Sequence, residues 1–274
     1  MFHGGKLKKE SFEERRKRLL NAAKEAVGSA YASDEKSIIQ AINAYFELDK
    51  LRNMLFERLE EWYSLHFPEL SSSNQNAYAK FIVEFGGDKK AATEGSLAKI
   101  FGGKAKDVYA AIAKSIGSEP SANEYAQIKG MASAVLQIAD LQKSIDKFIE
   151  ERSKSVMPNL TYLIDYKVAA QLLSKAGSLS KLAMMPASTI QLLGAEKALF
   201  KHLKFRSKAP KYGYIFKLPQ VMNAQKDQKG RMARIVAAKL AIASRADAFS
   251  KHFIADKLKA EIEKAVSSSG QKEK

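Results

Sequence analysis

Apolar residues recur at steps of three and four along most of the chain, the spacing of one helix face. One such stripe runs through residues 35–67 without Pro or Gly and predicts a single long helix; it comprises Ile38, Ile42, Tyr45, Leu48, Leu51, Leu55, Leu59, Trp62 and His66. A second, in residues 123–152, has the strictly alternating steps of a coiled-coil seam and comprises Ile128, Met131, Val135, Ile138, Gln142, Ile145 and Ile149. Gln142 would be a polar, register-fixing residue in that seam. Both stripes also fit the core of a helical bundle.

The stretch between the two predicted helices, residues 71–121, has a different character. It opens with a Ser/Asn/Gln run and contains two Gly-Gly pairs, at 86–87 and 102–103, with short helical pieces between them. We therefore expect an insertion at the tip of an antiparallel helical hairpin. Its apolar residues favour either self-association or a small satellite core; they include Phe81, Phe85, Ile100, Phe101 and Tyr109.

Helical patterning continues to the end of the chain, so the predicted fold class is all-α. Met157-Pro158 should end the second long helix, because a residue before proline is driven out of the helical region. A helix over about 160–175 should stop at Gly177, a glycine suited to a C-cap. The predicted division is a basic N-terminal extension (1–34), the hairpin (35–157), a compact helical module (158–255) and a polar tail (256–274) that starts helical and ends disordered.

The positive charge is concentrated in one part of the sequence. The formal net charge is +16, and residues 181–252 hold fifteen Lys or Arg against three Asp or Glu. Such asymmetry indicates a face for a polyanion, with nucleic acid the usual partner and an anionic membrane surface the alternative. The longest apolar run, Ile235 to Ala243, is far shorter than the ~20 residues that span a bilayer. With no secretory signal in the first thirty residues, we expect an intracellular, soluble protein.

Residues 194–204 predict a short helix opened by Gly194. Lys197, Lys201 and Lys204 recur at helical spacing and share one face, whereas Leu199, Phe200 and Leu203 can pack inward. The helix start, with its free amides, favours a phosphate. The same lysine stripe also fits an ordinary solvated helix face.

The loop that follows mixes cations with aromatic residues. Arg206, Lys208, Lys211 and Lys217 surround Tyr212, Tyr214 and Phe216, a combination that grips phosphates and stacks unpaired bases. The alternative is that residues 214–216 form a short buried strand.

The last predicted helix, residues 231–253, carries two stripes. Met232, Ile235, Lys239, Ile242, Ala246, Phe249 and Phe253 should face the core, and Arg231, Arg234 and Arg245 should share a neighbouring face with small alanines. Arginine suits phosphate because its planar fork donates two parallel hydrogen bonds. Lys239 either extends to solvent or meets a specific acceptor.

The residues that enzymes use are sparse and scattered. Four histidines lie far apart, cysteine is absent, and Gly102-Gly103-Lys104-Ala105 lacks the first glycine and the Ser/Thr of a phosphate loop. We therefore expect no catalytic residue, no metal site and no cofactor.

Long motifs of the basic region resemble the Nop domain. The matching runs are Leu182–Phe200, Pro210–Gly213, Lys229–Arg234 and Ala237–Leu240, and residues 61–70 resemble the end of that family's first coiled-coil helix. The resemblance covers roughly residues 35–253. It implies a protruding coiled coil and a C-terminal module that recognises a kink-turn (box C/D) RNA jointly with a small, ribosomal-protein-like kink-turn-binding protein.

By position, the resemblance assigns two sets of residues. The RNA-binding set is Lys197, Lys201, Lys204, Arg206, Lys208, Lys211, Lys217, Lys229, Arg231 and Arg234. The protein-binding set is Gly194, Ala195, Glu196, Ala198, Leu199 and Phe200. The expected role is a non-catalytic scaffold of a guide particle for RNA 2′-O-methylation, in the cytoplasm of an archaeal-type cell. A splicing-type relative and a general basic nucleic-acid binder are the alternatives.

The sequence departs from the family pattern before the first long helix. Guide-particle members carry a folded N-terminal domain that holds the methyltransferase fibrillarin, and the roughly 34 residues here are too few for it. Either the protein is truncated or split, or it belongs to a lineage that does not recruit the methyltransferase directly, and direct contact with fibrillarin is in doubt. Self-association through the coiled coil is implied, since archaeal scaffolds pair through it.

Overall fold

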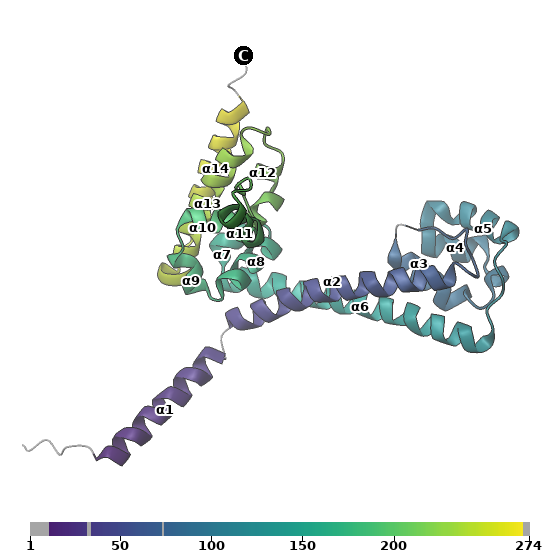
Figure 1. Ribbon diagram of the computed structural model, residues 1–274, viewed down its shortest axis with the longest axis horizontal. Coiled ribbons are helices and arrows are strands. Elements are labelled where there is room, and N and C mark those ends of the chain that lie inside the picture. Colours follow the sequence, from purple (N-terminus) through teal and green to yellow (C-terminus); the bar gives the residue numbers. More distant parts are fainter. Residues whose placement is uncertain (1–10, 32–33, 73, 271–274) are drawn as a thin grey trace, which may run out of the picture. The chain divides into compact units, whose positions relative to one another are not determined.

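A computed structural model describes residues 11–31, 34–72 and 74–270. These residues form helices joined by turns and loops, without any strand, so the all-α prediction is confirmed (Figure 1). The chain divides into two compact units, one of residues 41–150 and one built from residues up to Gln40 and from Glu151 onward. Within the latter, α1 spans Phe12–Tyr31, in the predicted basic extension.

The unit of residues 41–150 is built on two antiparallel helices, α2 (Asp34–Tyr63) and α6 (Ala122–Val156), which run side by side (Figure 1). Gln142 is buried in the α6 seam at 5% exposure, and its Nε2 donates to the Tyr45 carbonyl oxygen at 3.3 Å. The predicted polar seam residue is therefore confirmed, and it ties α6 to one level of α2.

The first long helix ends earlier than predicted, at Tyr63 instead of residue 67, and His66 lies in the turn that follows. The predicted stripe is also wrong at Leu51, which is exposed, whereas Phe56 is buried. The cause is that this end of α2 packs against the tip insertion as well as α6, with Phe56 and Tyr63 both in edge-to-face contact with Tyr78. A stripe predicted for packing against a single partner helix does not include Phe56 and Tyr63.

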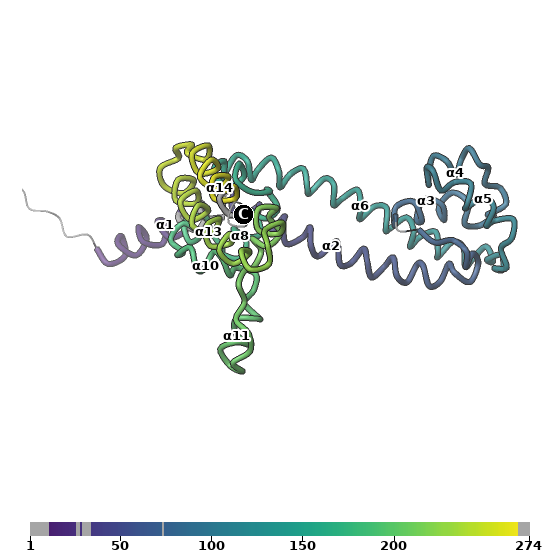
Figure 2. Tube along the Cα trace, turned by 90° about the horizontal axis from the view of Figure 1, so that it is seen from above, coloured from purple at the N-terminus to yellow at the C-terminus, as the bar shows by residue number. Residues whose placement is uncertain are grey.

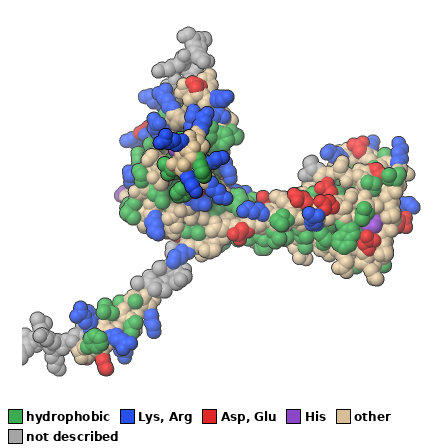
Figure 3. Space-filling view, in the orientation of Figure 1, with side chains coloured by type: hydrophobic (Ala, Val, Ile, Leu, Met, Phe, Trp, Pro, Cys, Tyr) green, Lys and Arg blue, Asp and Glu red, His purple; other side chains and the backbone are tan. Residues whose placement is uncertain are grey.

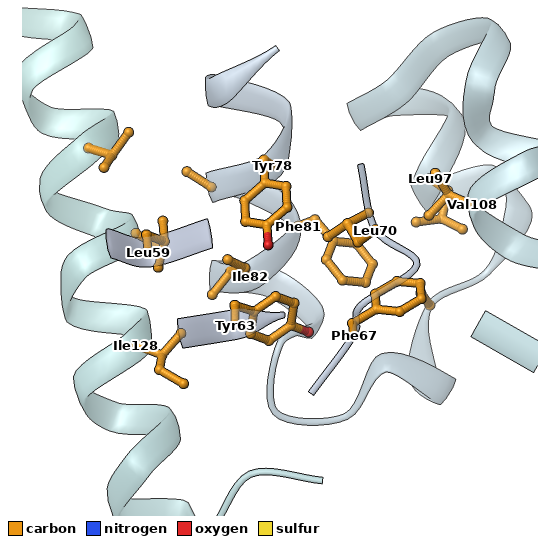
Figure 4. Packing of buried hydrophobic residues seen from close by; sticks show 14 of the residues in the cluster. Leu59, Tyr63, Phe67, Leu70, Tyr78, Phe81, Ile82, Leu97, Val108 and Ile128 are labelled. Carbon is orange, nitrogen blue, oxygen red and sulfur yellow. The ribbon is translucent and has the colours of Figure 1, made fainter. Parts of the chain in front are cut away.

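The tip insertion forms a satellite core together with the adjoining parts of α2 and α6 (Figure 4). Its elements are α3 (Gln75–Phe85), η1 (Lys89–Ala91), α4 (Glu94–Phe101), η2 (Gly102–Lys104) and α5 (Ala105–Lys114). Phe81 is fully buried among Tyr63, Phe67 and Phe85. Of the two interpretations of this insertion, the satellite core is the one observed.

The other unit contains short helices packed around a central one. They are α7 (Pro158–Leu163), α8 (Tyr166–Ala176), α9 (Leu179–Met184), α10 (Ala187–Leu192), α11 (Glu196–Phe205), η3 (Tyr214–Lys217), α12 (Pro219–Met222), α13 (Lys229–Arg245), η4 (Ala246–Ser250) and α14 (Ala255–Gly270). The central helix is α13, which packs against α7, α9, α10, α12 and α14.

The helix predicted over about 160–175 is interrupted. The chain leaves helical geometry at Ile164, and the Asp165 side chain then caps α8 by accepting from the amides of Lys167 and Val168. Gly177 ends α8 with a φ of 84°, as predicted. The polar tail is helical through Gly270, because Leu258 and Ile262 of α14 are buried in this unit; residues 271–274, where disorder was expected, lie outside the described residues.

The helix predicted over residues 231–253 is α13 only as far as Arg245, with η4 after it, and its core face differs from the predicted stripe. Ile242, Phe249 and Phe253 are exposed, and the buried face consists mainly of small residues: Met232, Ala233, Val236, Ala237, Leu240, Ala241, Ala243 and Ser244. Neighbours on several sides approach α13 closely, and only small side chains allow that approach. The predicted stripe placed the large residues inward, and at these three positions it was wrong.

A buried polar network holds the end of this central helix. Asp247 is 1% exposed, and its two carboxylate oxygens accept from the Asn159 amide, the Asn159 side chain and the Leu160 amide at 2.8–3.0 Å. Burial raises the pKa of Asp247, and these donors oppose the shift. The network satisfies the first amides of α7 and therefore has a structural role.

Candidate nucleic-acid interface

The candidate interface is built on a hairpin, which we name the α11 hairpin and define as residues 191–214. Its two ends are joined by backbone hydrogen bonds of 2.8 Å, from Gly213 to Gln191 and from Tyr214 to Leu193. The Gln191 side chain adds a bond to the Lys211 carbonyl oxygen at 2.6 Å. These bonds join the two segments of the hairpin to each other at its base.

Two glycines make that base possible. A Cβ on Gly213 would overlap the Leu193 carbonyl oxygen, so only glycine allows the two chain segments to pair. Gly194 has a φ of 91°, and a Cβ there would lie 2.7 Å from the Tyr214 ring. Glycine is needed at both positions because the two segments of the hairpin lie so close together there, and not because α11 begins nearby.

The helix of the hairpin, α11, projects from its unit with no buried residue (Figure 2). Phe200 is 69% exposed and Leu203 is 67% exposed, so the prediction that they pack inward is wrong. Lys197, Lys201 and Lys204 are exposed as well. Since ten residues are too few for a stable isolated helix, α11 depends on its anchored base.

Both ends of α11 are held by local bonds. At the start, Glu196 accepts from the Gly194 amide at 2.7 Å. Partial burial raises the pKa of this carboxyl, but the amide bonds outweigh it and the net shift is downward. At the other end, Arg206 adopts a left-handed φ of 51°, and His202 contacts the Ser207 carbonyl oxygen. Arg206 and Lys208 are exposed.

The aromatic residues of the returning loop lie against the start of α13. The Tyr212 and Phe216 rings are stacked 4.7 Å apart, and the Lys229 ammonium lies 5.3 Å from the Phe216 ring. The Cδ atom of Lys211 lies 3.6 Å from the position that a Cβ atom on Gly230 would occupy. Residues 214–217 form a 3-10 helix with Ile215 buried, so the strand interpretation is wrong although its buried centre is right.

Every charged residue in the first two turns of α13 is a cation. Lys229, Arg231 and Arg234 occupy them, and the first turn has no acidic residue. Cations at a helix N-terminus oppose the helix dipole, so an anion bound there would be stabilised by both. Lys239 is engaged elsewhere, paired with Glu261 of α14, so its inward position is explained by a specific acceptor.

The predicted cations thus fall into two groups. One lies on α11 and the turn after it and comprises Lys197, Lys201, Lys204, Arg206 and Lys208; the other lies on the 211–217 loop and the start of α13 and comprises Lys211, Lys217, Lys229, Arg231 and Arg234. Lys217 is partly committed, because its ammonium lies 3.4 Å from the Gln171 side-chain oxygen. Figure 3 shows Lys and Arg side chains gathered on this unit, with few acidic ones on the same face. We name these two groups together the cationic surface.

Sequence reasoning missed two contributors to this region. Gln191 anchors the hairpin base, and Phe205 is a further exposed aromatic residue of α11. Neither has a local pattern that singles it out, although Gln191 lies inside the run that resembles the Nop domain. In the part of the chain that the structure covers, no cluster of His, Asp or Glu could hold a metal ion, and no helix is long and apolar enough to cross a membrane.

Fold and site together define an all-helical protein that displays cations and apolar side chains on a projecting helix. The chain belongs to the Nop family: the model described as "snoRNA binding domain, fibrillarin" matches residues 44–268. It is 39% identical over 246 residues to an uncharacterized NOP5 family protein of Methanocaldococcus jannaschii, covering 89% of this chain and 59% of that one. It is 38% identical to human nucleolar protein 56 over 85% of this chain and 41% of that one.

A solved structure agrees with these matches. A chain in the crystal structure of a fibrillarin/Nop5p complex superposes with a TM-score of 0.55 at 25% identity, covering 96% of this chain and 80% of that one. Nucleolar protein 58 of Candida albicans is 40% identical over 78% of this chain and 42% of its own length. The chain therefore spans about two fifths to three fifths of these curated relatives.

Proposed function

We propose that this chain is a non-catalytic scaffold of a ribonucleoprotein particle of the box C/D guide type, which directs RNA 2′-O-methylation. The cationic surface binds a kink-turn RNA, and the start of the α11 hairpin binds the small protein already seated on that RNA. The family description and the names of the relatives support the particle class.

One observation carries the proposal: α11 has no buried residue. Lysines line part of it, and Phe200, Leu203 and Phe205 are each about two thirds exposed beside them. Lysines alone suit RNA, and apolar side chains alone suit a protein, so a helix presenting both fits a target made of protein and RNA together.

The proposed roles follow this division. Phosphates or the RNA stem would meet Lys197, Lys201, Lys204, Arg206, Lys208, Lys211, Lys217, Lys229, Arg231 and Arg234. The small protein would meet Gly194, Ala195, Glu196, Ala198, Leu199 and Phe200. Methyl transfer would come from a separate methyltransferase of the fibrillarin type, since fibrillarin is the protein that accompanies Nop5p in the similar solved complex.

Self-association through the helical hairpin is a further part of the proposal. Leu51 and Met54 of α2 and Leu141 of α6 are each about half exposed or more. Apolar side chains on an exposed helical surface are suited to a second copy of the same hairpin.

The experiment is a titration of labelled kink-turn RNA, alone and bound to its small protein, at two salt concentrations. We expect the protein–RNA complex to be bound at least ~10-fold more tightly than bare RNA, a coupling of about 1.4 kcal/mol. A general basic patch would instead bind duplexes, single strands and kink-turns alike, with affinity falling steeply as salt rises. A coupling below about 1 kcal/mol would overturn the composite target.

A splicing-type particle is the second candidate. No described residue favours it over the guide type. Binding to box C/D RNA and to a spliceosomal kink-turn RNA of equal stem length separates the two: a guide scaffold prefers the first.

A further inference from the structure

The helix α1 contributes to neither predicted set of site residues, although the side chains of its residues 12–25 are all exposed. Its start is fixed by a capping box. The Glu14 amide donates to the Ser11 hydroxyl at 3.2 Å, and the Ser11 amide donates to the Glu14 carboxylate at 2.9 Å. Local hydrogen bonds therefore define where α1 begins, without packing against another element.

Four consecutive cations follow this cap: Arg15, Arg16, Lys17 and Arg18. Successive residues of an α-helix point about 100° apart, so these four side chains leave α1 in directions spread around its circumference. Figure 3 shows Lys and Arg side chains on both edges of this helix. A block of this kind can meet anions on several sides at once, whereas a stripe at steps of three and four meets them on one side.

The apolar residues of α1 distinguish between two kinds of polyanion. Phe12, Leu19 and Leu20 are 83%, 58% and 52% exposed, and they line one hollow on the helix together with Arg15 and Arg16. A helix that lies on a membrane has an apolar side without charges, because a charge there is costly to desolvate. In α1 two arginines stand on that side. RNA suits this mixture, because its riboses and base faces lie beside its phosphates.

We propose that α1 binds RNA with phosphates on more than one side of the helix, as a helix does when it lies between two phosphate backbones. Arginine suits this role because its planar fork donates two parallel hydrogen bonds to phosphate oxygens. Arginine-rich segments are also a recurrent means of binding RNA. The inference rests on the proposed function, because it takes the RNA of the cationic surface as the ligand.

The test measures how the binding of labelled kink-turn RNA, without its small protein, depends on salt. Each of the four cations is replaced singly by glutamine, which is uncharged and a good helix former. We expect every one of these variants to reduce the slope of log affinity against log salt by about one. The control is Arg58→Gln on an exposed position of α2, which removes the same charge and should leave the slope unchanged.

The pattern among the four variants tests the geometry. Arg15 and Arg18 leave the helix about 60° apart, and Arg16 and Lys17 point to other sides. An effect at Arg15 and Arg18 alone would mean contact on one side and would overturn the proposal. An unchanged slope in all four variants, or an equal reduction in Arg58→Gln, would overturn it as well. Far-UV circular dichroism should be the same in every variant, so that a reduced slope reports lost contacts and not a lost helix.

A parallel measurement uses vesicles that contain phosphatidylserine. If the four variants bind these vesicles less well than the natural chain does, while their binding to RNA is unchanged, α1 belongs to a membrane surface and the proposal is wrong.

The two proposals fail separately. If the α1 variants keep the natural slope while the small protein still strengthens binding of the kink-turn RNA, the inference on α1 is wrong and the scaffold stands. If the slopes fall but the small protein adds nothing, α1 binds RNA and the composite target is wrong.

Discussion

Gly213 lies where the two segments of the α11 hairpin come closest, which makes Gly213→Ala a sharp test of how the hairpin is held. The added methyl group would overlap the Leu193 carbonyl oxygen, so the segments must separate. Two hydrogen bonds of 2.8 Å, Gly213 to Gln191 and Tyr214 to Leu193, are then lost or strained.

The magnitude follows from those two bonds. Each contributes about 1 kcal/mol net, so opening of the hairpin base becomes easier by about 2 kcal/mol. That is roughly a 30-fold increase in the open population. Leu193 and Ile215, beside these bonds, are buried, so the midpoint of global denaturation should fall by no more than the loss of the two bonds accounts for.

The assay is amide hydrogen exchange at Tyr214, whose N–H is one of the two donors. We expect exchange to accelerate roughly 30-fold in Gly213→Ala, with weaker binding of the kink-turn complex. Gly130→Ala is the control, because nothing lies within 4 Å of its Cβ position. It should leave Tyr214 exchange unchanged. Unaltered exchange in Gly213→Ala would refute this explanation of the hairpin base.

Three further predictions concern charge and docking. Lys204→Ala and Arg234→Ala should each weaken RNA binding and reduce the slope of log affinity against log salt by about one; an unchanged slope would remove that residue from the phosphate contacts. Ala195→Asp should abolish the gain from the small protein with little change in affinity for bare RNA, so equal losses on both targets would refute the division of roles. Folding raises the pKa of Asp247, mainly by burial, so folding favours its protonated form. This contribution is lost as pH rises through the folded-state pKa, and the stability of the natural chain relative to Asp247→Asn should increase between pH 7 and pH 4.5 in urea denaturation; a constant difference would contradict it.

Periodicity predicted the long helices well because α2 and α6 bury a long face of each helix against the other. Gln142 is the clearest case: its place in a strict seam predicted a polar residue in the interface, and it bonds across to Tyr45. The end of α2 was misplaced because the tip insertion, remote in sequence, packs there and buries Phe56 and Tyr63. A pattern read along one helix contains no information on such a neighbour.

Two errors in the unit that contains α13 have one physical origin. Large apolar residues were assigned to the core at Phe249 and Phe253 of the last helix, and Phe200 and Leu203 of α11 were expected to face inward; all four are exposed. The side chains that α13 buries are mostly alanines, whose small size is invisible to a search for large hydrophobic stripes. Exposed apolar residues of this kind are the signature of a surface that a partner covers.

The candidate residues themselves were found through the resemblance to the Nop domain, since a lysine stripe alone fits any solvated helix. Which cations approach one another could not be predicted from spacing. The contacts of Lys211 with Gly230 and of Lys229 with Phe216 join residues 19 and 13 positions apart, and they depend on how the loop returns beside α13.

The most direct measurement is amide hydrogen exchange across residues 196–205, in the free chain and in the complex with kink-turn RNA and its small protein. Free α11 has no buried residue, so its amides should exchange quickly. In the complex the same amides should become protected by at least ~10-fold, while those of α4 in the tip insertion stay unchanged. Tight binding of the complex with α11 still exchanging at its free rate would contradict the proposed docking, because the helix would then lie outside the interface.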